Sequence, residues 1–212
     1  MGTHHLQGLY AITDESSRSR FDLEAGVEAA IRGGARLVQY RDKTSDRRLK
    51  LHEANALRRV CHDEGALFIV NDDVDLALAS GADGVHLGAN DTALDKARRH
   101  LGKDAIIGVS CYGDLDRARS AAAAGADYLA FGALFMSQTK PDAPTIELDI
   151  FAQTAELGLP CCGIGGITTE NAPAVMAAGA QMIAVVKGLF DVDSVTAVEN
   201  NARQYARAIS RA

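Results

Sequence analysis

The residues best equipped for chemistry in this sequence are polar side chains that stand directly after short apolar runs. They comprise an amide, cations, carboxylates and hydroxyls, namely Gln39, Arg41, Lys43, Asn71, Asp72, Asp91, Ser110, Ser137, Thr139 and Lys140. Cationic and hydroxyl groups bind phosphate oxygens, and carboxylates bind divalent metal ions. This combination predicts a site for a phosphorylated ligand and a divalent cation.

The first cluster has its polar residues at every second position. If a strand continues through Arg41, the side chains of Gln39 and Arg41 share one face, and Lys43 lies just above it. Arginine offers a fixed fork to phosphate oxygens, and lysine offers a mobile point charge. A solvated strand end paired with Asp42 or Asp46 is the alternative. Gln39 favours a binding site, because an amide at an inward position needs a defined partner.

Two carboxylates follow neighbouring apolar runs and are candidate metal ligands. Asp72 comes after residues 67–70, and Asp91 comes after residues 84–87. Mg²⁺ is commonly bound by one or two carboxylates together with phosphate oxygens and water. Asp73 instead stands where the N-cap of the following helix is expected.

A glycine-rich stretch, residues 163–168, leads into a helix expected to start near Thr169. Backbone N–H groups at such a turn lack intrahelical partners and bind anions. A tight turn without a ligand is the structural alternative.

Two further side chains allow more than one interpretation. Lys187 is expected to end the eighth apolar run, where a desolvated lysine could form a Schiff base. An exposed or phosphate-facing cation is the favoured reading. His86 could shuttle protons, although a hydrogen-bonded histidine inside a barrel is favoured.

A repeated pattern indicates the elements that position these groups. Gly-Ala followed by an apolar strand occurs at residues 34–38, 81–85, 125–129 and 179–183. Glycine just past a helix end accepts the left-handed conformation that stops the helix. Strands are predicted to begin near Leu9, Leu37, Leu67, Gly84, Ile106, Tyr128, Cys161 and Met182, with helix-length stretches between them. This order predicts one (β/α)₈ barrel domain over residues 1–212, with its site at the C-terminal ends of the strands. An open doubly wound sheet is the alternative.

Bulk composition excludes several classes of protein. The 212 residues are 47% apolar and 24% charged, and the net charge of −6 argues against binding to nucleic acid. No run is long enough for a transmembrane helix, and the N-terminus lacks the pattern of a secretory signal. We therefore expect a cytoplasmic protein with small-molecule partners, and a homo-oligomer is compatible with the sequence. Cys61, Cys111, Cys161 and Cys162 lack zinc-site spacing, so reduced core cysteines are expected.

Taken in register, these motifs resemble the thiamine phosphate synthase family over almost the whole chain. The segments that carry the resemblance are residues 9–14, 38–43, 71–72, 84–88 with Asp91, 107–110, 139–140 and 163–167. Each motif is weak alone, and their common order is specific. The resemblance implies a (β/α)₈ barrel that joins hydroxymethylpyrimidine diphosphate to thiazole phosphate carboxylate, or a close relative of it, and releases diphosphate.

The resemblance also implies roles for individual residues. The pyrimidine diphosphate would be held by Gln39, Tyr40, Arg41, Asp42, Lys43, Asn71, Ser110 and Lys140, of which Arg41, Lys43, Ser110 and Lys140 would be catalytic. Mg²⁺ would be bound by Asp72 and Asp91. The thiazole phosphate would be held by Ser137, Gln138, Thr139, Gly165, Gly166, Val186 and Lys187. Because the attacking thiazole nitrogen has no proton to lose, positioning and charge stabilisation would suffice.

Two positions depart from the family pattern. The family commonly has Pro-Thr where this chain has Met136 and Ser137, and it commonly has serine where Lys187 stands. Three other functions are therefore kept open. They are a thiazole tautomerase of the same barrel family, a Schiff-base aldolase that uses Lys187 or Lys140, and a non-catalytic protein that binds thiamine intermediates.

Overall fold

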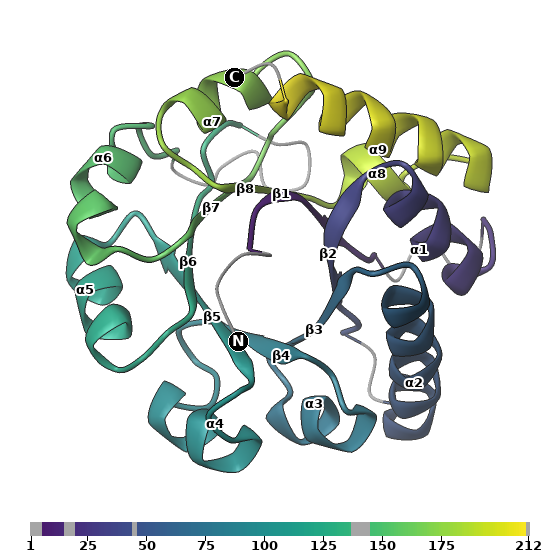
Figure 1. Cartoon of the computed structure of the whole chain (residues 1–212), viewed down its shortest axis with the longest axis horizontal. Coiled ribbons are helices and arrows are strands. Elements are labelled where there is room, and N and C mark those ends of the chain that lie inside the picture. Colours follow the sequence, from purple (N-terminus) through teal and green to yellow (C-terminus); the bar gives the residue numbers. More distant parts are fainter. Residues whose placement is uncertain (1–5, 15–19, 44–45, 137–144, 211–212) are drawn as a thin grey trace.

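Eight parallel strands form a closed barrel inside a ring of helices (Figure 1). The computed structural model describes residues 6–14, 20–43, 46–136 and 145–210. The strands are β1 (Gly8–Ile12), β2 (Ala35–Tyr40), β3 (Leu67–Asn71), β4 (Gly84–Leu87), β5 (Ile106–Tyr112), β6 (Tyr128–Phe131), β7 (Cys161–Ile164) and β8 (Met182–Val185). Each strand pairs with the next, and β1 pairs with β8 to close the ring. The predicted (β/α)₈ barrel is confirmed, and the open sheet is wrong.

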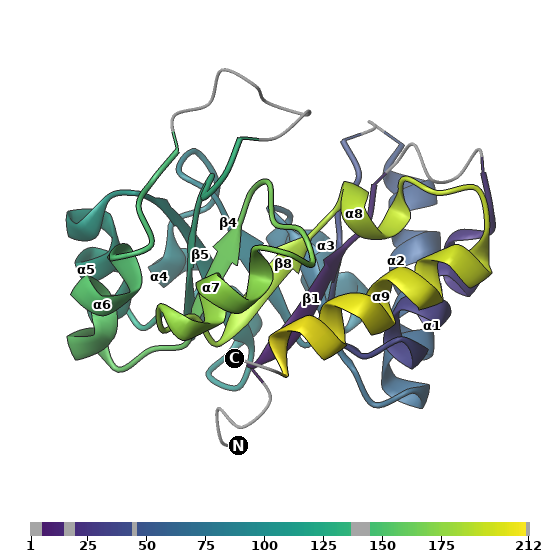
Figure 2. The same cartoon turned by 90° about the horizontal axis from the view of Figure 1, so that it is seen from above.

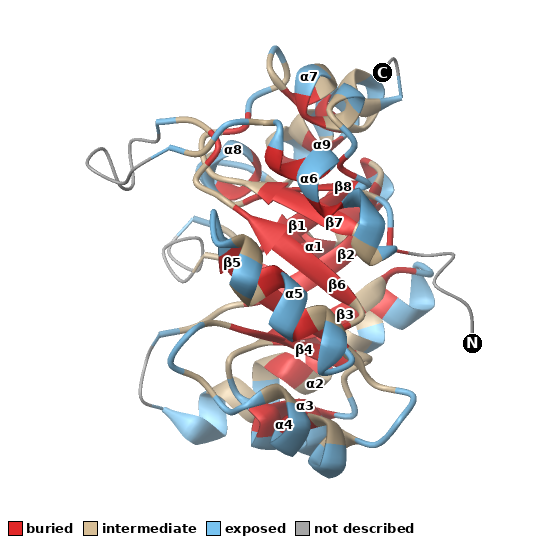
Figure 3. Cartoon of the chain, turned by 90° about the vertical axis from the view of Figure 1, so that its left-hand side faces the viewer, coloured by how far each residue is buried: buried red, intermediate tan, exposed pale blue. Residues whose placement is uncertain are grey.

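The helices lie outside the strands, and their outward faces are exposed (Figures 2 and 3). They are α1 (Leu23–Arg32), α2 (Arg47–Asp63), α3 (Val74–Ser80), α4 (Leu94–Leu101), α5 (Leu115–Ala123), α6 (Ile150–Thr154), α7 (Ala172–Ala177), α8 (Lys187–Phe190) and α9 (Val195–Ile209). A 3₁₀ turn, Ala155–Leu157, follows α6. None of the described helices is long and apolar enough to span a membrane.

The recurring Gly-Ala pattern acts at the bottom of the barrel. Its glycines, Gly34, Gly81, Gly125 and Gly179, all have positive φ, as expected for residues that stop a helix. In three of the four copies, the side chain of the residue that follows Gly-Ala accepts a hydrogen bond from a backbone N–H near the start of the preceding strand. Asp127 Oδ2 lies 2.7 Å from the Ile107 nitrogen, and the Asp127 N–H donates back to the Ile107 carbonyl at 2.8 Å. Asp83 with Phe68, and Gln181 with Cys161, form the same two-bond clasp.

Replacing Asp127 by alanine is expected to destabilise the barrel without touching its mouth. The change leaves the buried Ile107 N–H without its acceptor and removes the 2.6 Å ion pair to Arg98. We expect a loss of about 1–3 kcal/mol in the free energy of unfolding, measured by urea titration. Asp116→Ala, which removes an exposed carboxylate from the neighbouring helix, is the control and should change stability by under about 0.5 kcal/mol. Equal effects of the two changes would contradict a clasp at Asp127.

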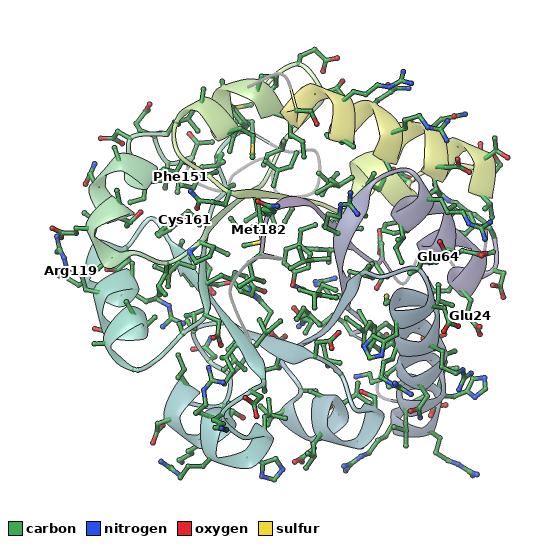
Figure 4. The ribbon with its side chains drawn as sticks, viewed as in Figure 1. Glu24, Glu64, Arg119, Phe151, Cys161 and Met182 are labelled. Carbon is green, nitrogen blue, oxygen red and sulfur yellow. The ribbon has the colours of Figure 1, made fainter. Side chains whose placement is uncertain are left out.

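Two apolar clusters hold the barrel together. One fills the space between strands and helices, and it includes Phe151 and Cys161. The other fills the barrel interior, and it includes Cys162 and Met182. Figure 4 shows Met182 inside the ring of strands, with Cys161 and Phe151 on the helix side. Cys161 and Cys162 therefore face opposite sides, as predicted, and all four cysteines are free and buried.

Among the residues that the structure describes, the inward side chains near the mouth are polar on one side of the barrel and apolar on the other. Towards the C-terminal ends of β2, β3, β4 and β5, the inward side chains are Gln39, Asn71, His86 and Ser110, whereas β1, β6, β7 and β8 present Ile12, Ala130, Ile164 and Ala184. This asymmetry places the hydrogen-bonding groups over half of the circumference. A ligand in the mouth would therefore meet polar groups on one side and apolar groups on the other.

Candidate active site

A chain of hydrogen bonds crosses the barrel just beneath its mouth. Gln39 Nε2 donates to the Tyr10 hydroxyl at 2.8 Å, and the hydroxyls of Tyr10 and Tyr128 are 2.9 Å apart. The Tyr128 hydroxyl lies 2.8 Å from His86 Nδ1, and His86 Nε2 lies 2.8 Å from Ser110 Oγ. Five side chains from β1, β2, β4, β5 and β6 are thus connected. Our sequence analysis assigned no role to Tyr10 and Tyr128, because a tyrosine in an apolar strand resembles an ordinary core residue.

His86 is held as a neutral imidazole within this chain. Burial lowers its pKa to about 4, against a weaker opposing effect of the Asp72 charge. Its ring stacks on Tyr128 with 5.5 Å between the ring centroids. Both ring nitrogens have protein partners. The favoured reading of a hydrogen-bonded barrel histidine is therefore confirmed.

Gly108 makes the position of the Tyr128 ring possible. A Cβ atom built on Gly108 would lie 1.9 Å from Tyr128 Cζ and 2.3 Å from its hydroxyl oxygen. Any larger residue in this part of β5 would therefore occupy the space that the ring fills. Gly108, which follows two isoleucines in the sequence, therefore leaves the space inside the barrel that the Tyr128 ring fills.

Asp72 and Asp91 are brought together above β3 and β4. Asp91 Oδ2 accepts a 2.6 Å hydrogen bond from the Gly88 N–H, and the carboxyl groups of Asp91 and Asp72 are close enough to affect each other's pKa. Burial and the contact with Asp72 raise the pKa of Asp91. Burial also acts to raise the pKa of Asp72, but hydrogen bonds from Lys43 and Asp91 hold it below its ordinary value. Two carboxyl groups in such proximity favour a shared proton or a bound cation.

The backbone at Asp72 is unusual for a residue other than glycine. Its φ is 63°, which lies in the left-handed region, and its N–H donates to the His86 carbonyl at 2.8 Å. Lys43 Nζ forms a 2.6 Å ion pair with Asp72 Oδ2. Strained backbone of this kind is concentrated at functional sites. Asp73, in contrast, caps α3 by accepting a hydrogen bond from the Leu76 N–H at 2.8 Å, as predicted.

The remaining predicted residues of β2 divide between the two faces of the barrel wall. Arg41 follows the end of β2, and its N–H donates to Thr13 Oγ1 at 2.9 Å, which ties the ends of β1 and β2 together. Tyr40 lies in the apolar cluster on the helix side, and its hydroxyl is 2.6 Å from Glu53 Oε2 and 3.3 Å from Asp42 Oδ2. Tyr40 thus faces away from the interior in which Gln39 lies.

The glycine-rich turn after β7 has two consecutive residues with positive φ, Gly165 at 95° and Gly166 at 64°. The hydrogen bonds described for this turn use its carbonyl groups, which accept from Leu134, Phe135 and the Asn171 side chain. Among the described residues, the N–H groups of Gly165 and Gly166 have no partner. These two N–H groups are therefore available to an anion in the mouth.

Two expectations around β7 and β8 need correction. The helix after the glycine turn begins at Ala172 rather than near Thr169, because Thr168 and Asn171 hydrogen bond to each other and form a turn first. Lys187 does not end β8, which stops at Val185, but is the first residue of the short helix α8 and is exposed. An exposed cation at this place agrees with the favoured reading of Lys187.

Four predicted residues, Ser137, Gln138, Thr139 and Lys140, lie outside the described residues. Within the described ranges, no group of three or more histidine, cysteine, aspartate or glutamate side chains converges. The pair formed by Asp72 and Asp91 is instead the kind of set that binds a hard cation together with ligand phosphates.

Fold and site together define a class: a (β/α)₈-barrel protein whose mouth combines backbone N–H groups, a lysine and two neighbouring carboxylates. Residues 9–189 match the thiamine monophosphate synthase family. The chain belongs to this family, and it is a transferase.

Individual relatives agree over nearly the whole length. The thiamine-phosphate synthase of Thioalkalivibrio sulfidiphilus is 55% identical over 186 residues, which are 87% of this chain and 88% of that protein. The thiamine-phosphate synthase of Chromobacterium violaceum is 52% identical over 192 residues, 91% of this chain and 92% of that protein. The solved structure of the thiamine phosphate pyrophosphorylase of Pyrococcus furiosus superposes with a TM-score of 0.87 at 32% identity, covering 99% of this chain and 98% of that one.

Proposed function

We propose that this protein couples hydroxymethylpyrimidine diphosphate to thiazole phosphate, or to its carboxylate, and releases diphosphate. The observation that carries the proposal is the asymmetric mouth, in which the inward groups of β2 to β5 are polar and the paired carboxylates stand above them. Such a mouth suits a polar, diphosphorylated substrate on one side and a second substrate beside it. Membership of the thiamine monophosphate synthase family supports the same assignment.

The pyrimidine diphosphate would occupy the polar side. Gln39, Asn71 and Ser110 provide neutral hydrogen-bonding groups there, and Arg41 and Lys43 provide positive charge. Lys140 and Asp42 complete the proposed set, and Tyr40 would act from the helix side through its contact with Asp42. Arg41, Lys43, Ser110 and Lys140 would stabilise the negative charge that develops as diphosphate leaves.

Mg²⁺ would be held by Asp72 and Asp91. Their fit to the ion rests on their proximity, because two neighbouring carboxyl groups that shift each other's pKa are stabilised by a positive charge between them when both are ionised. When bound, the ion would neutralise charge on the diphosphate. Lys43, already paired to Asp72 at 2.6 Å, is close enough to act on the same phosphate oxygens.

The thiazole phosphate would bind beside the glycine turn. The N–H groups of Gly165 and Gly166 would donate hydrogen bonds to its phosphate. The backbone around Val186 and Lys187 and the side chains of Ser137, Gln138 and Thr139 complete the proposed set. The exposed ammonium of Lys187 adds a positive charge at the position where relatives of this family commonly have serine. Because the thiazole nitrogen carries no proton, its attack needs no general base.

A coupled assay for diphosphate release tests the proposal directly. Purified protein with both substrates and Mg²⁺ should release diphosphate, and removal of the metal with a chelator should abolish the release. Omission of the thiazole phosphate should also abolish it. Isomerisation of the thiazole carboxylate without any diphosphate release would contradict the proposal and would favour a tautomerase.

A further inference from the structure

The hydrogen-bond chain beneath the mouth could run in either direction, and the donor at its Gln39 end favours one of them, because each hydroxyl has only one proton. Gln39 Nε2 donates to the Tyr10 oxygen, so the Tyr10 proton is free for the Tyr128 oxygen 2.9 Å away. The Tyr128 proton then points to His86 Nδ1 at 2.8 Å. A nitrogen that accepts a proton in a hydrogen bond is unprotonated, so the neutral ring carries its proton on Nε2.

The last link of the chain reaches Ser110. In this direction of the chain, the Nε2–H group of His86 is the donor to Ser110 Oγ, which lies 2.8 Å away. Among the described residues, His86 is the only hydrogen-bond partner of this hydroxyl oxygen, so the Ser110 proton has no protein acceptor there. Ser110 is partly exposed at the C-terminal end of β5. Its O–H can therefore be donated into the mouth.

We infer that Tyr128 is a positioning residue that holds His86 in the Nε2–H form and thereby makes Ser110 a hydrogen-bond donor to an anionic phosphate oxygen. The opposite direction would have Ser110 donate to His86, and its oxygen lone pairs would then face the substrate. The ionised oxygens of a diphosphate are hydrogen-bond acceptors, so a lone pair of Ser110 directed at them would repel them. This inference rests on the proposed function, because it takes the substrate at Ser110 to be the diphosphate.

The burial of the chain explains how the direction is kept. Tyr10 and Tyr128 are at most 1% exposed and Gln39 is 2% exposed, so water cannot exchange for a link. Burial also raises the pKa of both tyrosines, so each keeps its proton. A buried chain with all members satisfied is rigid, and reversing it requires every proton in it to move together.

Nitrogen-15 NMR of the histidine rings tests the inference on the free protein, without substrate. In protein labelled with ¹⁵N-histidine, the ring assigned to His86 by its loss in His86→Gln should be in the Nε2–H form at neutral pH. In Tyr128→Phe, Nδ1 loses its donor and can take the proton, so the Nδ1–H form should appear. Tyr10→Phe is the matched control, because Tyr128 keeps its own proton and still donates to His86; the Nε2–H form should persist.

Kinetics provide the second readout. In Tyr128→Phe, kcat/KM for the pyrimidine diphosphate should fall about tenfold, as expected for one misdirected hydrogen bond to a charged group, while KM for the thiazole phosphate stays unchanged. An Nδ1–H form in the wild type, or an unchanged tautomer in Tyr128→Phe, would overturn the inference. If Tyr128→Phe does not fold, the wild-type spectrum decides the direction alone. Failure of the proposed function would be seen separately, as wild-type protein with the Nε2–H form but no diphosphate release.

Discussion

Asp72→Asn is expected to lower Mg²⁺-dependent turnover by on the order of 10²–10³-fold, the loss typical when one charge-stabilising group is removed from an active site. The change removes the charge that pairs with Lys43 and one of the two proposed metal ligands. Asparagine tolerates the left-handed backbone at this position, where φ is 63°. The substitution therefore tests the charge rather than the turn. Turnover is measured as diphosphate release across a Mg²⁺ titration.

The same variant should bind thiazole phosphate almost as tightly as the wild type, because that ligand is proposed to lie at the opposite side of the mouth. Calorimetric titration with thiazole phosphate alone measures this. Asp75→Ala is the matched control: it removes a carboxylate from the first turn of α3 whose partner is His100, not Lys43. Equal losses of turnover and of thiazole phosphate binding in Asp72→Asn would count against a metal role for Asp72.

Gly108→Ala is expected to cost about 1–3 kcal/mol of folding free energy, in the range of overpacked cores, and to abolish most turnover. The new methyl group would overlap the Tyr128 ring, with 1.9 Å to Cζ. The ring cannot retreat easily, because Tyr10 and His86 contact it from other strands. Urea unfolding at equilibrium measures the stability, and the diphosphate assay measures the turnover.

A double-mutant cycle identifies the origin of that cost. Tyr128→Leu removes the ring, so the further change Gly108→Ala should cost much less in its presence than in the wild type. The double variant should regain stability relative to Gly108→Ala but not turnover, because the hydrogen-bond chain is still broken. An equal cost of Gly108→Ala in both backgrounds would mean that the overlap with Tyr128 is not its cause.

The barrel itself could be predicted because its strands are short and apolar, and because four of them (β2, β4, β6 and β8) coincide with the Gly-Ala pattern. Six strands begin at the predicted residues, while β1 begins at Gly8 rather than Leu9 and β2 at Ala35 rather than Leu37. Inward positions such as Gln39 followed from strand alternation alone. The helix boundaries near the mouth were less predictable, because side-chain turns such as the one between Thr168 and Asn171 compete locally with the helix.

The contacts between distant residues could not be read from the sequence. The hydroxyls of Tyr10 and Tyr128 meet across 118 positions, and neither strand carries a local sign of that contact. The left-handed backbone of Asp72 was equally hidden, because it depends on the hydrogen bond to the His86 carbonyl of the neighbouring strand. Polar clusters therefore located the mouth, whereas the network beneath it required the three-dimensional arrangement.

The pairing of β1 with β8 has a consequence for how the chain becomes active. Leu9 lies beside Ile183 in the closed ring, so β1 keeps an unpaired edge during synthesis until β8 has left the ribosome. Contacts this distant in sequence form slowly, since a long loop must close before they contribute. Tyr10 sits on that same late-paired strand. Closure of the ring and completion of the mouth would thus be a single late event in assembly.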